Sequence, residues 1–132
     1  MNLFQEGKLK LKAKLPFSVV YHDPCYLGRY NEEYEAPRQV LKRSINFPLI
    51  EMERVKEKSF CCGGGGGHAW MELNIGKRMS HERLEEALRT KANVIGTACP
   101  FCAFMLDDAI KVKDVENKLQ VKDLAEILAE CV

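Results

Sequence analysis

Short apolar runs alternate with amphipathic segments along most of the chain. Runs that are short and rich in β-branched residues predict strands over 17–21, 47–55 and 92–100, with a short fourth strand early in 118–132. Apolar positions three and four residues apart predict helices over 35–45 and 99–112, and a last helix near the C-terminus. This alternation predicts an α/β fold in which a small, mostly parallel sheet of about four strands is flanked by helices.

The segment between the second and third predicted strands has a weaker helical pattern, in two parts. Gly76 interrupts the pattern, and Ser80 is a residue type that caps a new helix. The apolar positions are Met71, Ile75 and Met79 in the first part, and Leu84, Ala87 and Leu88 in the second. We therefore predict a helix that is broken near Gly76 and restarts at Ser80.

The first residues are predicted to form a segment that leads into the domain. Residues 8–15 alternate Lys with Leu or Ala, which predicts a short exposed strand or an extended segment, and Pro16 ends it. A chain of 132 residues is long enough for one core and too short for two ordinary domains. We expect one domain over 1–132, with 1–16 as its N-terminal lead-in segment.

Composition narrows the class of protein. Hydrophobic residues make up 46% and charged residues 30%, while the net charge is only +1. This balance suits a soluble globular chain and gives no reason to expect a nucleic-acid partner. No apolar run approaches the roughly 20 residues of a membrane span. We expect a cytoplasmic protein with no direct membrane span, associated with a membrane only through a partner.

The cysteines are the strongest chemical signal. Five of the six follow predicted strands: Cys25 after the first, Cys61 and Cys62 after the second, and Cys99 at the end of the third, with Cys102 in the next helical turn. In an open α/β sheet the carboxyl ends of the strands form one edge, where ligands bind. The topology therefore predicts that these five thiols converge.

Several kinds of chemistry could use such a group of thiols. A single zinc ion takes four ligands and would leave one thiol over. An iron–sulfur cluster can use adjacent cysteines on neighbouring irons. The pair Cys99 and Cys102 forms a CxxC motif at a predicted helix N-terminus, and taken alone this could be a dithiol redox motif. Cys25 and the Cys61–Cys62 pair make that alternative weaker.

Five glycines follow the cysteine pair. The run Gly63 to Gly67 can adopt positive φ, which would let the backbone pass close to a bulky cluster and direct N–H groups at its sulfur atoms, and Gly63 and Gly64 are the candidate cofactor-binding positions. A phosphate-binding loop is the competing interpretation, but the run lacks the Lys-Ser/Thr of a P-loop and fits the dinucleotide pattern only weakly. A flexible linker would not need to begin with two cysteines.

The combined pattern resembles a known family. Cys25 is followed after 35 residues by Cys61-Cys62-Gly63, and then after a further 35 residues by Cys99-x-x-Cys102. These cysteines lie within "YHDPCYLGR", "FCCGGGGG" and "ACPFC", and "IGKR" lies between the second and third of these segments. The arrangement is similar to the cysteine-rich CCG domain found in the B-type and D-type subunits of heterodisulfide reductase and in related Fe–S oxidoreductases. The resemblance is greatest to the C-terminal part of the D-type subunits.

The resemblance implies a cofactor and partners. It implies a non-cubane [4Fe–4S] cluster held by Cys25, Cys61, Cys62, Cys99 and Cys102, which transfers electrons or reduces a disulfide substrate. Other subunits or domains of an Fe–S/flavin redox complex are the implied partners. Larger relatives carry two such domains, often with a ferredoxin-like segment, so this chain is either a small subunit or a fragment. An isolated chain could also hold zinc or no metal.

Other residues near the motif have less specific roles. His22 is a candidate proton donor to a leaving thiolate, although a hydrogen bond that orients the loop is the simpler role. Trp70 and Phe101 would shield the site from water, and Cys131 is expected in the core. Two alternative functions remain: a zinc-stabilised interaction module, and a thiol–disulfide redox domain that uses Cys99 and Cys102 without a cluster.

Overall fold

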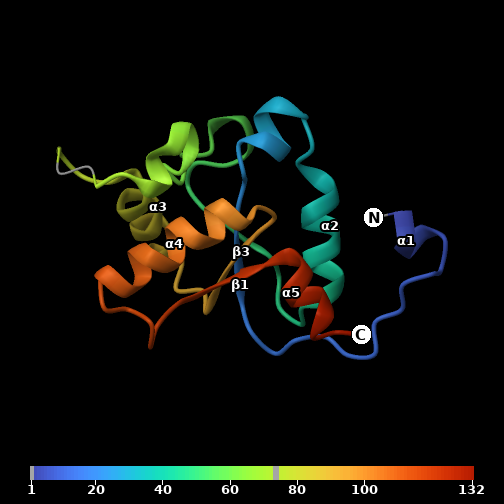
Figure 1. Ribbon diagram of the computed structural model, residues 1–132. Coiled ribbons are helices and arrows are strands. Elements are labelled where there is room, and N and C mark those ends of the chain that lie inside the picture. The colour runs from blue at the N-terminus through green and yellow to red at the C-terminus, as the bar shows by residue number, and fades with distance from the viewer. Residues whose placement is uncertain (1, 73–74) are drawn as a thin grey trace.

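Figure 1 presents a computed structural model of the chain, which describes residues 2–72 and 75–132. The strands are β1 (Val19–His22), β2 (Ile50–Glu51), β3 (Val94–Thr97) and β4 (Gln120–Asp123). The α-helices are α1 (Asn2–Gln5), α2 (Glu35–Ser44), α3 (Met79–Arg89), α4 (Pro100–Val112) and α5 (Leu124–Ala129). Three tighter or wider turns complete the fold: the π-helical η1 (Tyr26–Tyr30) and the 3₁₀ turns η2 (Lys56–Lys58) and η3 (Gly65–Trp70).

The four strands form one parallel sheet in the order β2-β1-β3-β4. This confirms the predicted α/β fold. The second strand lies on one side of β1 and the third on the other, so the chain reverses its direction of winding between β1 and β3. In sheets of this kind the carboxyl ends of the strands at such a reversal border a crevice. His22 pairs with Thr97 in register at that point.

Alternation along β1 divides its side chains between two helical layers. Val19 and Tyr21 pack in one cluster with Leu41 of α2 and Ile127 of α5, whereas Val20 packs in the other. That second cluster contains Leu84 of α3 and Leu106 of α4, both fully buried. Figure 1 shows α3 and α4 on one side of the sheet and α2 and α5 on the other. Because successive strand residues face opposite ways, His22 points to the same side as Val20, toward α3 and α4.

The second strand is much shorter than predicted. We predicted a strand over 47–55, but only Ile50 and Glu51 pair with β1, at the edge of the sheet. The chain then leaves the sheet and forms η2 before it reaches Cys61. The cysteine pair is therefore carried to the edge of the sheet by a loop and not by the strand itself.

The prediction of a two-part helix before the third strand is also partly wrong. Met71 is extended (φ −108, ψ 132), Gly76 has a positive φ of 66 and α3 begins only at Met79. Part of the predicted first half lies at residues 73–74, outside the described residues. Ser80 is not the cap, because Arg78 occupies that position, and Ser80 is buried in the first turn of α3. The positive φ at Gly76 is incompatible with a helix continuing through it.

The lead-in segment is not a strand. Within 8–15, only Leu15 makes a β-bridge, to Ile45 at the end of α2. The segment also crosses the C-terminal end of the chain, since the Lys12 N–H donates to the carbonyl of Cys131 at 2.7 Å. Within 2–72 and 75–132, we find no helix with the length and apolar character that a membrane crossing requires.

Candidate metal centre at the carboxyl edge of the sheet

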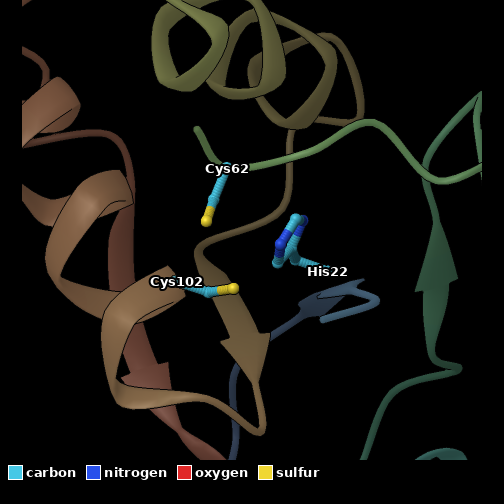
Figure 2. Close-up of side chains that lie close together, drawn as sticks. All are labelled: His22, Cys62 and Cys102. Atoms are coloured by element: carbon cyan, nitrogen blue, oxygen red, sulfur yellow. The ribbon is translucent and has the colours of Figure 1, made fainter. Parts of the chain in front are cut away.

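Three buried side chains meet where β1 and β3 end. One ligand atom each of His22, Cys62 and Cys102 lies within 4.8 Å of the others. His22 is the last residue of β1, Cys62 lies in the loop before the glycines, and Cys102 lies in the first turn of α4. Figure 2 shows the three side chains pointing toward one another. Segments that are distant in sequence are thus joined by the topology of the sheet.

The thiols form a connected set. Cys61 and Cys62 are adjacent in the chain, and the sulfur atom of Cys62 lies within 4.8 Å of that of Cys102. Interaction with the Cys62 thiol, and then burial, raises the pKa of Cys61 well above its ordinary value. Interaction with the Cys102 thiol, together with burial, raises the pKa of Cys62 to about 12. In the metal-free chain these two thiols are protonated at neutral pH, and a bound metal would have to displace their protons.

The first two glycines pack tightly against this set. The Gly63 N–H donates to Sγ of Cys61 at 3.3 Å. Gly63 has a φ of +84, and a Cβ there would lie 3.1 Å from Cβ of Met79. A Cβ on Gly64 would lie 3.0 Å from Cγ of Met105 and 3.7 Å from Sγ of Cys62. Side chains at either position would crowd the loop that holds the cysteine pair.

The remaining cysteines occupy different positions. Cys25 and Cys99 lie after β1 and β3, where they precede η1 and α4, and both are partly exposed. Neither belongs to the group within 4.8 Å, nor does Cys61. Cys131 is only 1% exposed and its thiol donates to the carbonyls of Ser44 and Ile127. It is a core residue between α2 and α5.

A buried ion pair fixes the loop that follows β1. Both carboxylate oxygens of Asp23 accept hydrogen bonds of 2.7 Å from the guanidinium of Arg38 on α2. One of these oxygens also accepts the Lys56 N–H at 2.9 Å. Burial alone would raise the pKa of Asp23, but these hydrogen bonds outweigh it and hold the pKa below its usual value. Arg38 also binds Glu51 at the end of β2, so the loop carrying Cys25 is joined to that strand.

A second buried network reaches the site from α3. The Nε–H of Arg83 donates to Nδ1 of His22 at 3.0 Å. Its other nitrogens donate to the carbonyl of Arg54 at 2.9 Å, to Oγ of Ser59 at 3.1 Å and to the carboxylate of Glu86. Burial, and then the charge of Arg83, lowers the pKa of His22 to about 3. His22 is consequently neutral at physiological pH.

The sequence did not identify these buried charges. Arg83 and Glu86 are 0% and 2% exposed, and Arg38 is 2% exposed. Charged residues on amphipathic helices are usually assigned to the solvent face. One signal was available: Arg83 lies four residues before Ala87, on the stripe that faces the core.

The site also contains an unpartnered hydroxyl. Thr97 pairs with His22 in register, so both side chains face the α3 and α4 side of the sheet. Its Oγ1 is buried and has no hydrogen-bond partner among the residues that the structure describes. Buried polar groups are rarely left without partners. Together with the thiol donors, this hydroxyl fits a site that receives a further polar or anionic group.

The aromatic residues near the motif are mostly exposed. Trp70 is 78% exposed and packs loosely on Phe104, with 6.0 Å between ring centroids, while Phe101 is 54% exposed. His68 is exposed and its Nδ1 lies 2.7 Å from the carbonyl oxygen of Gly65. None of these side chains belongs to the buried group of His22, Cys62 and Cys102.

Residues 19–107 match the family described as the cysteine-rich CCG domain. They span β1 to α4 and contain the five motif cysteines. The chain belongs to this family.

Similar proteins are larger. A probable iron–sulfur-binding oxidoreductase of Bacillus subtilis is 44% identical over 131 residues, which are 99% of this chain and 19% of that protein. An EtfAB:quinone oxidoreductase of Syntrophomonas wolfei is 42% identical over 96% of the chain and 19% of its own length. The D-type subunit of a dihydromethanophenazine:CoB–CoM heterodisulfide reductase of Methanosarcina barkeri is 35% identical over 99% of the chain and 32% of its own length. The chain thus spans about a third or less of the curated relatives it matches.

Proposed function

We propose that this chain is an iron–sulfur redox domain that binds a non-cubane [4Fe–4S] cluster through Cys25, Cys61, Cys62, Cys99 and Cys102. The observation that carries the proposal is that the thiols of Cys62 and Cys102 meet within 4.8 Å in a CCG-family domain, with Cys61 next to Cys62 in the chain. The similarity to named iron–sulfur and heterodisulfide oxidoreductases supports the same class of cofactor.

The donor set favours a sulfur-rich metal group. Thiolates are soft ligands that suit iron–sulfur clusters and zinc. Adjacent cysteines such as Cys61 and Cys62 can bind neighbouring metal ions. The Gly63 N–H already donates to Cys61 Sγ, and such a donor stabilises thiolate once the proton has left. When bound, the cluster would supply one-electron transfer.

The chain's own residues would hold and insulate this centre. Arg38 and Asp23 fix the loop that carries Cys25, and Gly63 and Gly64 allow the loop of the cysteine pair to pack closely against Met79 of α3 and Met105 of α4. Cys62 and Cys102 are 4% and 2% exposed, so water is largely excluded from that end of the site. Burial and hydrogen bonds to sulfur are the main means by which a protein sets a cluster's potential.

The alternatives are less well supported. A thiol–disulfide redox domain would work through Cys99 and Cys102 alone, and it gives no role to the buried Cys62, whose thiol lies within 4.8 Å of Cys102. A zinc module would use four ligands, and the set of five motif cysteines exceeds that number. We therefore rank a zinc site with cysteine ligands second, after the iron–sulfur cluster.

We also propose that electrons pass between this domain and other parts of a larger redox complex. The chain covers 19% to 32% of its relatives, which leaves most of their length to domains that could exchange electrons with it. For a complex of the heterodisulfide reductase type that contains this domain, we propose a disulfide as the substrate.

Matched cysteine variants test the proposal. The chain is reconstituted anaerobically with iron and sulfide, and bound iron, sulfide and the EPR spectrum are measured. Cys61→Ser or Cys62→Ser should lower the cluster content strongly, whereas the buried control Cys131→Ser should leave it unchanged. A folded wild-type chain that binds no iron and sulfide, or equal losses in all three variants, would contradict the proposal.

A further inference from the structure

The two ring nitrogens of His22 meet different surroundings. Nδ1 accepts the Nε–H of Arg83 at 3.0 Å. The ring also lies against the thiols of Cys62 and Cys102, with ligand atoms within 4.8 Å, and Figure 2 shows the side chains directed at one another. Because Arg83 occupies Nδ1, Nε2 is the ring nitrogen that remains available for a partner among the sulfur atoms.

Arg83 determines where the ring carries its proton. A guanidinium has N–H donors and no acceptor, so the nitrogen that it contacts must offer a lone pair. In an imidazole with one proton, the other nitrogen then carries that proton. The structure thus favours the tautomer that is protonated on Nε2.

Arg83 has little freedom to release His22. Its side chain is 0% exposed, and its remaining nitrogens are held by the Arg54 carbonyl, Ser59 Oγ and the Glu86 carboxylate. The side chain of Glu86 is itself buried and also binds Arg54. The guanidinium is therefore fixed from α3 and from the loop before Cys61, with its Nε–H directed at the end of β1.

This arrangement is the reverse of that of a metal-ligating histidine. A histidine ligand usually donates its second ring N–H to a carboxylate or a backbone carbonyl, which leaves the first nitrogen free to bind the metal. Here the second nitrogen meets a cationic donor. Nε2 then carries a proton and has no lone pair for a metal ion.

We propose that Arg83 fixes His22 with its proton on Nε2, so that His22 donates a hydrogen bond to sulfur at the Cys62–Cys102 end of the site and is not a metal ligand. His22 is in this sense a positioning and tuning residue. A donor near cluster sulfur favours the reduced, more negative state and so raises the reduction potential. The position of the proton does not depend on any cofactor, and only this effect on the potential rests on the proposed function.

The ring proton can be observed directly. The metal-free, reduced chain is labelled with ¹⁵N-histidine, and long-range ¹H–¹⁵N correlation spectra give the tautomer of each ring. The signals of His22 are those lost in His22→Gln. We expect a protonated Nε2 and an unprotonated Nδ1, and the same pattern after zinc is added as a probe. A proton on Nδ1, or loss of the Nε2 proton when zinc binds, would overturn the proposal.

Two substitutions separate donation to sulfur from metal ligation. Glutamine can accept from Arg83 and donate to sulfur, whereas leucine can do neither. In the reconstituted chain we expect both His22→Gln and His22→Leu to keep the wild-type iron content. Only His22→Leu should shift the reduction potential to more negative values. Equal loss of iron in both variants would identify His22 as a ligand and overturn the proposal.

These measurements also distinguish this proposal from the function proposed above. If the NMR spectra show the proton on Nε2 while the chain takes up no iron or sulfide, the assignment of His22 stands and the cluster proposal fails. If a cluster forms and the proton lies on Nδ1, the cluster proposal stands and the role given to Arg83 fails.

Discussion

Asp23 accepts two hydrogen bonds of 2.7 Å from Arg38, and both side chains are almost completely buried. Asp23 lies two residues before Cys25, and Arg38 lies on α2. This pair therefore joins the helical layer on one side of the sheet to the loop that carries a motif cysteine. The same carboxylate binds the Lys56 N–H, in the segment that leads to Cys61.

Replacing Asp23 by Asn should destabilise the fold and loosen this loop. The change leaves Arg38 buried with Glu51 as its remaining anionic partner among the described residues, and breaking one side of a buried pair costs about 3 kcal/mol. Chemical denaturation should show the loss in the free energy of unfolding. The control is Asp107→Asn, which breaks an exposed, solvent-screened pair with Lys111 and should have a far smaller effect. Equal effects would contradict the structural role assigned to Asp23.

Gly63 should tolerate a side chain less well than Gly67. Both have a positive φ, +84 and +79, but only a Cβ on Gly63 would meet a neighbour, Cβ of Met79 at 3.1 Å. Gly63→Ala should therefore cost about 1–3 kcal/mol more than Gly67→Ala, and it should also lower metal uptake by the cysteine pair. Thermal unfolding and metal content measure the two effects. Indistinguishable variants would mean that close packing at Gly63 is unimportant.

The metal-free chain should lose stability in mild acid because of His22. Its pKa falls from 6.5 to about 3 through burial and the Arg83 cation. Between these values the unfolded chain binds a proton that the native chain does not. The contribution of neutral His22 to the free energy of unfolding is thus fully present above pH 6.5, and it declines as the pH falls toward 3.

Unfolding measured across this range provides the test. His22→Gln should flatten the decline, while the exposed control His68→Gln should preserve it. The pKa of Asp23 is held below its ordinary value of 3.8, so the stability that this carboxylate provides should be lost only as the pH falls below 3.8. A decline that is unchanged in His22→Gln would assign the acid sensitivity to another group.

Metal binding should release protons from the cysteine pair. Cys61 and Cys62 have raised pKa values, so both are protonated at neutral pH before metal binds. The apparent affinity for zinc, used as a probe, should therefore increase as the pH is raised from about 6 to about 8. Calorimetry in buffers of different ionisation enthalpy counts the protons. Cys62→Ser should reduce the count by about one; a count unaffected by this variant would contradict the proposed ligand role.

The sheet could be predicted because the sequence signals for its strands are local. Apolar β-branched runs precede Cys25 and Cys99, and alternation with helices predicts a parallel sheet with a ligand-binding carboxyl edge, where the structure brings Cys62 and Cys102 together. The strand before Cys61 was overestimated, since its apolar residues pack at the edge of the sheet without extended pairing. Those contacts depend on the fold and not on local pattern.

The buried polar network could not be predicted in the same way. Arg83, Glu86 and Arg38 resemble ordinary surface charges in the sequence, and only the packing of α3 and α2 shows that they face inward. His22 was a candidate proton donor, but its contact with Arg83 spans 61 positions of the chain. Such long-range pairings leave no periodic signal.

The elemental content of the anaerobically purified chain tests the central claim most directly. Iron, acid-labile sulfide and zinc are measured per folded chain from cells grown with ample iron. The account predicts about four iron and four sulfide atoms per chain, with iron–sulfur absorbance that is lost in Cys62→Ser. One tightly bound zinc, without iron or sulfide, would contradict it and would identify a zinc-stabilised module instead.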